Sequence, residues 1–354
     1  MTIRWRYGLY LALFTAAQVT VGTATSAVPE TRRELDSEWI QIPTASGEMI
    51  WIPRRAVEMQ ARFRPAFAEE DVEFVFYSRS LSSDGQTFRL SSLEELDEEV
   101  FLSSRPTRVV IHGWLNNRNS PMSVNIRDAY LIGWDLNVIV VDWSKCANWL
   151  NYISVTSCVR VVGNALSKLL DNLQNSRGLS LNDVYLIGHS LGAHAAGIAG
   201  KSCRDISTII ALDPALPLFS IHNPENRVDV EDAEYVEVIH TSGGLLGFLE
   251  PVGTADYYPN GGQKQPGCGL NLAGICAHSR AWQLFVETLM EPEENLLAEP
   301  IYTIPRLPVE EKSDSGRRSK MGGEPSSQAN GLFYIDTNDR SPYFGTNQKS
   351  NETN

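Results

Sequence analysis

One short stretch of the chain limits the possible folds more than any other. Residues 184–200 read VYLIGHSLGAHAAGIAG, an apolar run followed by Ser190 between two glycines and then by almost nothing but alanine and glycine. This order predicts a strand, a sharp turn at the serine and a helix that lies close against a sheet. Side chains at Gly188 or Gly192 would collide with their neighbours in such a turn. The stretch therefore predicts a nucleophile elbow, with an ordinary tight turn and an incidental serine as the alternative.

The surrounding sequence alternates between strand-like and helix-like segments from about residue 70 to residue 290. Stretches with helical spacing, such as 161–174, separate several β-rich apolar runs, which are VEFVFYSR, TRVVIHGW, NVIVVDW, DVYLIGHS, STIIALDP and EYVEVIHTS. Strands that are apolar on both faces and separated by helices imply a mostly parallel sheet covered on both sides. We therefore expect an α/β fold with a mostly parallel central sheet and helices on both faces.

The domain organisation follows from shifts in composition along the chain. We expect a signal peptide over 1–27, an N-terminal extension laid on the core over 28–65 and one α/β domain over 66–305. Residues 306–329 have the composition of a flexible linker, and residues 330–354 suggest a terminal hairpin or edge strands and a tail. No internal repeat and no second domain of useful size is evident.

The first residues and the overall charge bear on location and partners. Arg4 and Arg6 precede an apolar run that ends in small residues near Ala27, which is typical of a cleaved signal peptide and predicts a secreted, extracellular protein. An amphipathic first helix or a retained anchor is the alternative. The formal net charge of −13 disfavours nucleic acid as a partner and gives no attraction to anionic membranes.

Secretion affects how the five cysteines are interpreted. Cys268 and Cys276 bracket one short loop, and Cys146 and Cys158 bracket another, so we pair them provisionally as disulfides. Metal ligation is the competing interpretation, but neither pair has the spacing of a zinc site. Cys203 is most simply a buried small apolar residue, with a reactive thiol or an intermolecular bridge as the alternatives.

A serine hydroxyl needs a base, and the base needs an orienting acid. In this fold the chain order is serine, acid, histidine. Asp213 follows directly on the apolar run STIIAL, at the sheet end that also carries Ser190. Asp205 in a loop and Asp229 in an acidic cluster are weaker candidates for the acid.

The base is expected late in the chain. His278 lies ahead of the helical run RAWQLFVETLM, in a segment that we expect to be a loop. His189 and His194 suit local packing or hydrogen bonding, and His240 ends a strand. We therefore predict His278 as the general base.

Two backbone N–H groups should stabilise the oxyanion in this fold. Leu191 follows the nucleophile at the start of the helix. Trp114 follows Gly113 in the loop after an early apolar run, where glycine lets the backbone approach closely. We predict Leu191 and Trp114 as the donors, with an ordinary glycine turn and a core tryptophan as the alternative for the second.

Seven segments occur in an order that resembles the pancreatic lipase family of α/β-hydrolases, and most closely its single-domain secreted members from invertebrates. They are VVIHGW, VVDW, GHSLGAHAAG, LDPA, VIHT, YYPNGGQKQPGC and CAHSRA. The resemblance implies that Ser190, Asp213 and His278 form a catalytic triad, and that Trp114 and Leu191 form the oxyanion hole. It covers about residues 70–290 and returns in FYIDTNDRSPY near the C-terminus.

The resemblance also implies a structural calcium ion, which the chemistry itself does not require. Arg227, Asp229 and Asp232 match the family's ligand spacing, with Glu225 displaced by one position. Two carboxylates with backbone carbonyls suit a hard cation. A solvated acidic turn is the alternative.

Departures from the vertebrate pattern bear on the substrate. The lid segment between Cys268 and Cys276 is only GLNLAGI, and the loop HTSGGLLGFLEPVG is also short; both features resemble the phospholipases A1 of the family. No C-terminal PLAT sandwich domain, and hence no colipase, is expected. Leu245, Leu246, Phe248 and Leu249 either touch lipid or pack inward.

The sequence therefore predicts a secreted serine esterase that hydrolyses acyl ester bonds of lipids, with phospholipase A1 activity as the specific expectation. The partner is a phospholipid or acylglycerol at a membrane or droplet surface. A triacylglycerol or carboxylester lipase is the first alternative. A yolk-protein-like storage or binding role is the second, and the complete triad argues against it.

Overall fold

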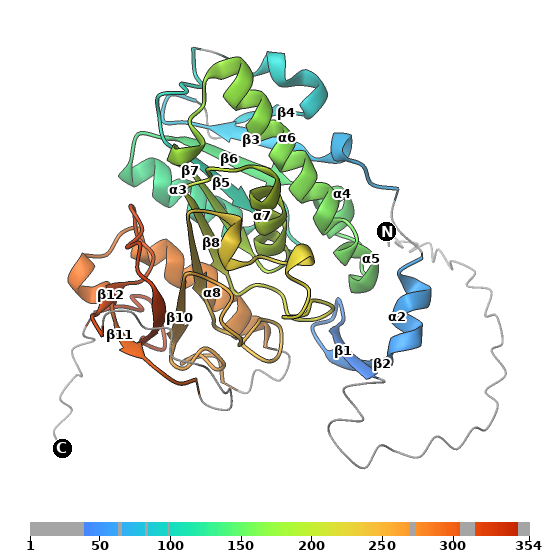
Figure 1. The fold of residues 1–354 in the computed structure, drawn as a ribbon, viewed down its shortest axis with the longest axis vertical. Helices are drawn as coiled ribbons and strands as arrows, with labels where there is room; N and C mark the ends of the chain where they lie inside the picture. Colours follow the sequence, from blue (N-terminus) through green and yellow to red (C-terminus); the bar gives the residue numbers. More distant parts are fainter. Residues whose placement is uncertain are drawn as a thin grey trace, which may run out of the picture.

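The computed structural model describes residues 39–62, 66–81, 84–97, 99–269, 274–304 and 316–345. The predicted signal peptide, residues 306–315 of the predicted linker and part of the predicted lid lie outside these ranges. An eleven-stranded sheet forms the centre of the described chain, in the order β12-β11-β13-β10-β9-β8-β7-β5-β6-β3-β4. Figure 1 shows this sheet between helices.

The strands of the sheet are short and mostly parallel. Their bounds are β3 Glu73–Tyr77, β4 Gln86–Phe88, β5 Thr107–Ile111, β6 Asn137–Asp142, β7 Val184–His189, β8 Thr208–Leu212, β9 Tyr235–Ile239, β10 Ala255–Pro259, β11 Leu297–Ile301, β12 Ser319–Lys320 and β13 Gly331–Ile335. The run from β6 through β5, β7, β8, β9 and β10 to β13 is parallel, whereas β3, β4, β11 and β12 pair antiparallel at the two edges. Six of these strands are the apolar runs predicted from the sequence.

Helices cover both faces of the sheet, as predicted. α6 (Val159–Arg177) and α7 (Leu191–Ser202) pack on one face, and α3 (Pro121–Gly133) and α8 (Ile275–Thr288) pack on the other. Shorter helices are α2 (Arg54–Gln60), α4 (Ser144–Ala147) and α5 (Tyr152–Thr156), and the 3₁₀ turns are Glu69–Asp71, Leu90–Glu95, Leu181–Asp183, Pro224–Asn226, Val230–Asp232 and Glu293–Leu296.

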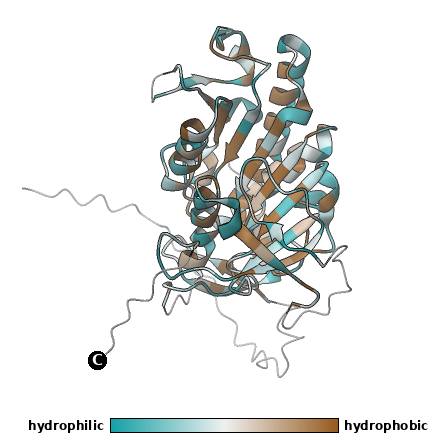
Figure 2. Cartoon of the chain, turned by 90° about the vertical axis from the view of Figure 1, so that its left-hand side faces the viewer, coloured by the Kyte–Doolittle hydropathy of each residue, from teal (hydrophilic) through white to brown (hydrophobic). Residues whose placement is uncertain are grey.

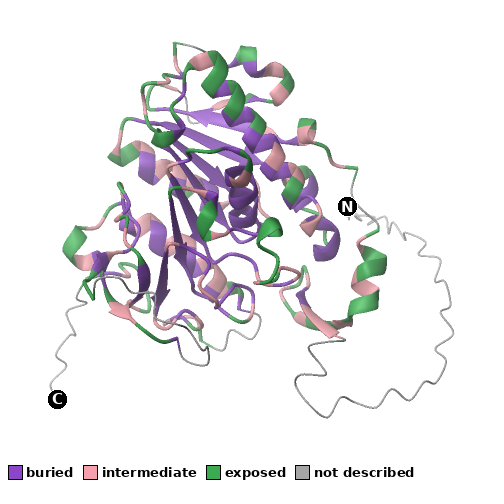
Figure 3. Cartoon of the chain, in the orientation of Figure 1, coloured by how far each residue is buried: buried purple, intermediate pink, exposed green. Residues whose placement is uncertain are grey.

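The core lies in two layers because successive residues of a strand face opposite sides. In β5, Val109 and Ile111 face the α6–α7 layer, whereas Val110 faces the α3–α8 layer. The strands are accordingly apolar along their length and buried, as Figures 2 and 3 show. The segment Tyr152–Arg177 is long and apolar enough to cross a membrane, but 67% of its most apolar stretch is buried inside the protein, so α6 is a core helix.

Where it is described, the N-terminal extension over 28–65 forms an antiparallel hairpin of β1 (Trp39–Pro43) and β2 (Met49–Pro53) that leads into α2. Two other segments differ from the sequence-based expectations. The expected flexible linker is wrong for residues 316–329, since buried Arg108 hydrogen-bonds Glu324 through Nε at 2.7 Å and Nη2 at 2.6 Å. The terminal segment is neither a hairpin nor an edge, because β13 inserts between β10 and β11.

Candidate active site

Ser190 occupies the turn between β7 and α7. Its φ of 58° and ψ of −120° are unusual for a residue with a side chain, and such strain persists only where the surrounding structure enforces it. A Cβ on Gly188 would lie 2.4 Å from the Gly192 carbonyl oxygen, and one on Gly192 would lie 2.2 Å from the Ile111 carbonyl oxygen. The two glycines are thus required by the close approach of backbone segments, which is the geometry of a nucleophile elbow.

Asp213 follows β8 and is fully buried, also with positive φ, 45°. Its Oδ2 accepts a hydrogen bond from His278 Nδ1 at 2.5 Å. Its Oδ1 accepts the backbone N–H groups of Thr241 at 2.8 Å and Ser242 at 3.0 Å. Because the carboxylate is an acceptor, it holds the proton of a neutral imidazole on Nδ1 and leaves Nε2 free to take one.

His278 lies in the first turn of α8, so the expectation that it lies in a loop is wrong. Its backbone N–H donates to the Gly274 carbonyl oxygen at 2.7 Å. The helix begins immediately after Gly274, whose φ is 74°, without a side-chain cap. The run RAWQLFVETLM begins at Arg280, whereas the helix begins at Ile275 and already buries Ala277.

His189 also contacts His278, through the backbone carbonyl and through the ring. The His189 Nε2–H donates to the His278 carbonyl oxygen at 3.1 Å, and the two ring centroids are 4.6 Å apart. Burial lowers the pKa of His189 to about 3, with the nearby His278 adding to the effect. His189 is therefore neutral near pH 7 and acts as a hydrogen-bond donor, one of the local roles suggested by the sequence.

Ser190 and His278 line one cavity of about 230 Å³, together with Trp114, Leu115 and Tyr152. Within the described chain no hydrogen bond joins the Ser190 hydroxyl to the His278 ring. Catalytic hydrogen bonds are often long in unliganded enzymes and shorten when substrate binds. The structure thus places the predicted base and nucleophile at the same cavity, with the acid behind the base.

The two loops predicted to supply the oxyanion hole both reach Ser190. A Cβ on Gly113 would lie 2.9 Å from Ser190 Cβ, so the backbone just before Trp114 passes directly beside the serine. Leu191 is the first residue of α7, where backbone N–H groups have no partner in the helix and the helix dipole is positive. The Trp114 side chain is fixed by donating from Nε1 to the Trp149 carbonyl oxygen at 2.7 Å.

Three further histidines hold loops in place and do not reach the cavity lining. His112 stacks on Trp143 with centroids 5.5 Å apart. The His194 Nε2–H donates to the Ala215 carbonyl oxygen at 2.7 Å, and the buried His240 ring bonds Asp256 at 2.9 Å. These contacts fix the backbone around the cavity.

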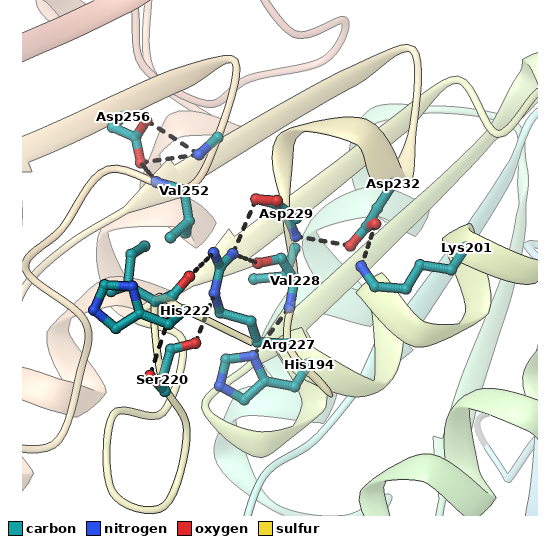
Figure 4. Close-up of polar contacts among 12 residues, drawn as sticks. His194, Lys201, Ser220, His222, Arg227, Val228, Asp229, Asp232, Val252 and Asp256 are labelled. Carbon is teal, nitrogen blue, oxygen red and sulfur yellow. Dashed lines mark hydrogen bonds and ion pairs between the residues drawn. The ribbon is translucent and has the colours of Figure 1, made fainter. Parts of the chain in front are cut away.

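Three of the four predicted calcium ligands, Arg227, Asp229 and Asp232, lie in a loop beside Lys201 of α7 (Figure 4). Asp232 pairs with Lys201 through Oδ1 and accepts the Asp229 N–H through Oδ2 at 2.7 Å. Asp229 Oδ1 accepts from the Arg227 guanidinium at 3.0 Å.

The Glu225 carbonyl accepts from Arg160 at 3.1 Å. Lys201 and Arg227 thus already neutralise the carboxylates of Asp232 and Asp229. The donors as arranged therefore do not fit a calcium ion, which needs six to eight oxygens. In the described chain, no group of three or more acidic, histidine or cysteine side chains could hold a metal. The arrangement thus argues against the calcium ion that the family resemblance implies.

The sequence did not reveal several groups that shape the site. The two amides that bind Asp213 come from the segment after β9, and a Cβ on Gly247 would lie within 2.6 Å of both Asp213 carboxylate oxygens. The hairpin residues Pro43, Thr44, Ala45 and Gly47 line the cavity. Gly247, in the run GGLLGFLEP, was the one signal in the sequence for this close approach to Asp213. Leu246, Phe248 and Leu249 are all buried, and Leu246 also lines the cavity.

The structure joins Cys146 to Cys158 and Cys268 to Cys276 as disulfides. The first ties α4 to the start of α6, and the second closes the loop before α8. Cys203 is unpaired and buried, and burial raises the pKa of its thiol to about 12. At neutral pH this thiol stays protonated, which makes it a poor nucleophile.

Comparisons with known proteins identify the family. The model of the lipase family matches residues 38–343. Lipase member H from Oryctolagus cuniculus is 34% identical over 62% of this chain and 49% of its own, and lipase member H-A from Xenopus laevis is 40% identical over 52% and 42%. Pancreatic triacylglycerol lipase from Mus musculus is 33% identical over 64% of this chain and 53% of its own.

The chain spans about half the length of these curated relatives. The family match, by contrast, covers most of the chain and includes the elbow, the acid and the histidine. The α/β-hydrolase fold and the matched segment together show that this chain belongs to the pancreatic lipase family.

Proposed function

We propose that the protein is a carboxylic ester hydrolase that acts on acyl esters of lipids. One observation carries the proposal: the Asp213–His278 hydrogen bond of 2.5 Å lies behind a cavity that the strained Ser190 also lines. A serine, a histidine and a buried carboxylate in this arrangement suit acyl transfer.

The chemistry follows from the positions of these groups. His278 Nε2 takes the proton of the Ser190 hydroxyl as its oxygen attacks the ester carbonyl carbon. The N–H groups of Leu191 and Trp114 stabilise the resulting oxyanion, and loss of one such donor typically lowers kcat by about 10²-fold or more. Protonated His278 then gives the proton to the leaving alcohol, and water releases the acid from the acyl-enzyme through the same base.

A lipid substrate is supported by the apolar side chains around the cavity. Of thirteen exposed large apolar side chains in the described chain, Leu115 and Ile275 line the cavity. Trp149 and Leu150 lie in the segment whose Trp149 carbonyl accepts a hydrogen bond from Trp114 of the lining, and Ile50 and Trp51 belong to the hairpin whose tip lines the cavity. Exposed apolar side chains at and beside a cavity suit an apolar ligand. The net charge of −13 favours a zwitterionic or neutral lipid surface over an anionic one.

Phospholipase A1 activity is the specific form of the proposal. It is supported by the seven-residue segment between Cys268 and Cys276, of which residues 270–273 lie outside the described chain, and by the short loop after β9. Triacylglycerol hydrolysis is the second candidate, since the similar protein from Mus musculus is a pancreatic triacylglycerol lipase. We further propose that the protein is secreted, because two disulfides persist in an oxidising environment.

The experiment compares the purified protein on phosphatidylcholine vesicles and on emulsified triolein, with Ser190→Ala as the control. Fatty acid released from the first acyl position of phosphatidylcholine supports phospholipase A1 activity. Release from triolein alone contradicts it and favours the second candidate. Hydrolysis of neither, or full activity in Ser190→Ala, contradicts the esterase mechanism, and ester binding without hydrolysis favours a storage role.

A further inference from the structure

The tip of the N-terminal hairpin is a hydrogen-bonded turn that joins β1 to β2. The Thr44 N–H donates to the Glu48 carbonyl oxygen at 2.7 Å, and the Gly47 N–H donates to the Thr44 carbonyl oxygen at 2.9 Å. The Thr44 hydroxyl also accepts the Glu48 N–H at 3.0 Å. These bonds close the turn onto itself, so its residues have a defined position.

The body of the hairpin is anchored on the domain. Ile42 is buried in the core, and Ile40 and Ile52 pack against the same core from partly exposed positions. The Gln60 side chain of α2, which follows β2, accepts a hydrogen bond from Asn151 at 3.4 Å. Because both ends of the segment contact the domain, the tip is held where it meets the cavity.

The tip itself forms part of the cavity wall. Pro43, Thr44, Ala45 and Gly47 line the cavity that contains Ser190 and His278. A Cβ on Gly47 would lie only 2.4 Å from Ile275 Cδ1, so the tip contacts the first residue of the helix that carries His278. Ser46, between Ala45 and Gly47, is exposed and is not among the residues lining the cavity.

We propose that this hairpin tip is the wall that limits acyl-chain length in the active-site cavity. The proposal rests on the proposed function, because it assigns the space next to Ser190 to the acyl chain of the substrate. Ala45 is exposed like Ser46 but, unlike Ser46, lines the cavity, so a larger side chain at Ala45 narrows this space. A chain that no longer fits loses the favourable burial of its distal methylenes.

The test uses two neighbouring substitutions that add the same bulk. Ala45→Phe places a ring at the cavity, and Ser46→Phe places the same ring at an adjacent exposed position outside the lining. Both variants are assayed with p-nitrophenyl acetate, butyrate, octanoate and palmitate, which share one leaving group. We expect Ala45→Phe to lose roughly tenfold to 10²-fold more in kcat/KM on the long esters than on the acetate, mainly through KM.

Several outcomes separate this inference from the proposed function. An equal loss on all four esters in Ala45→Phe, or the same profile in both variants, overturns the wall assignment. Activity on the acetate reports that the variant is folded, and Ala45→Val provides a smaller step that should shift the profile in the same direction. If the wild-type protein hydrolyses none of the four esters, the proposed function itself is contradicted. A failure of the wall assignment, by contrast, is seen only in the variants of an active wild-type enzyme.

Discussion

Gly247→Ala tests whether the placement of the Asp213 carboxylate controls catalysis. A Cβ at this position would lie 2.3 Å from Asp213 Oδ1, about 1 Å inside the 3.4 Å at which ordinary van der Waals contact begins. Gly247 has no positive φ, and the three atoms nearest to the added methyl all belong to the Asp213 carboxylate. The carboxylate must move by about that distance, and its 2.5 Å bond to His278 then breaks or tilts.

The expected magnitude follows from the role of that bond. A misplacement of about 1 Å can cost roughly 10²-fold in rate, and loss of correct orientation of the triad histidine can cost about 10⁴-fold. We therefore expect kcat on a soluble ester to fall by roughly 10²-fold to 10⁴-fold. KM should change little because Asp213 is fully buried and is not among the residues lining the cavity.

The control is Gly133→Ala, since a Cβ there meets no atom within 4 Å. Thermal unfolding of both variants separates loss of catalysis from loss of folded protein. Overpacking at Gly247 should cost about 1–3 kcal/mol, which a domain of this size tolerates. A folded Gly247→Ala enzyme with wild-type kcat would refute the role assigned to the carboxylate position.

Three other predictions concern stability, metal binding and the lipid surface. Burial raises the pKa of the Glu237 carboxyl from its ordinary value of 4.5 to about 7, so the bound proton stabilises the fold below the unfolded pKa and this contribution is lost as the pH rises through 7. Glu237→Gln should therefore match wild-type stability in chemical unfolding near pH 4 and exceed it by roughly 3 kcal/mol near pH 8; equal differences at both pH values would contradict this. Millimolar calcium should leave the wild-type Tm unchanged but raise the Tm of Lys201→Met, in which Asp232 loses its cation; a wild-type Tm that rises with calcium would show that the ion binds. Leu150 and Ile132 are similarly exposed, 72% and 67%, so they form a matched pair. In a Ser190→Ala background, Leu150→Ser should weaken cosedimentation with phosphatidylcholine vesicles more than Ile132→Ser does; equal weakening would contradict an apolar lipid surface at the cavity.

The parts of the fold that the sequence predicted depend on local patterns. The elbow at Ser190 was predictable because its two glycines and the small residues after them have a single steric purpose. The parallel strands were predictable because they are apolar on both faces. Asp213 could be assigned because the end of a parallel strand and the chain order limit the choices.

The remaining parts depend on contacts between distant segments. Nothing in residues 39–53 indicates that their hairpin tip lies at the cavity, because a terminal segment can dock at many places on a domain. The position of β13 depends on its pairing with β10 and β11, and not on its own composition. The calcium expectation considered only one loop, whereas the cation beside Asp232 is Lys201 on α7.

Covalent labelling of the serine tests the central claim most directly. The purified protein is treated at neutral pH with a p-nitrophenyl alkylphosphonate, which reacts with a hydroxyl activated by a histidine, and the labelled peptide is identified by mass spectrometry. The account predicts one label, on Ser190, and its loss in His278→Ala. A label elsewhere, no label on Ser190, or equal labelling in His278→Ala would contradict a catalytic triad in this cavity.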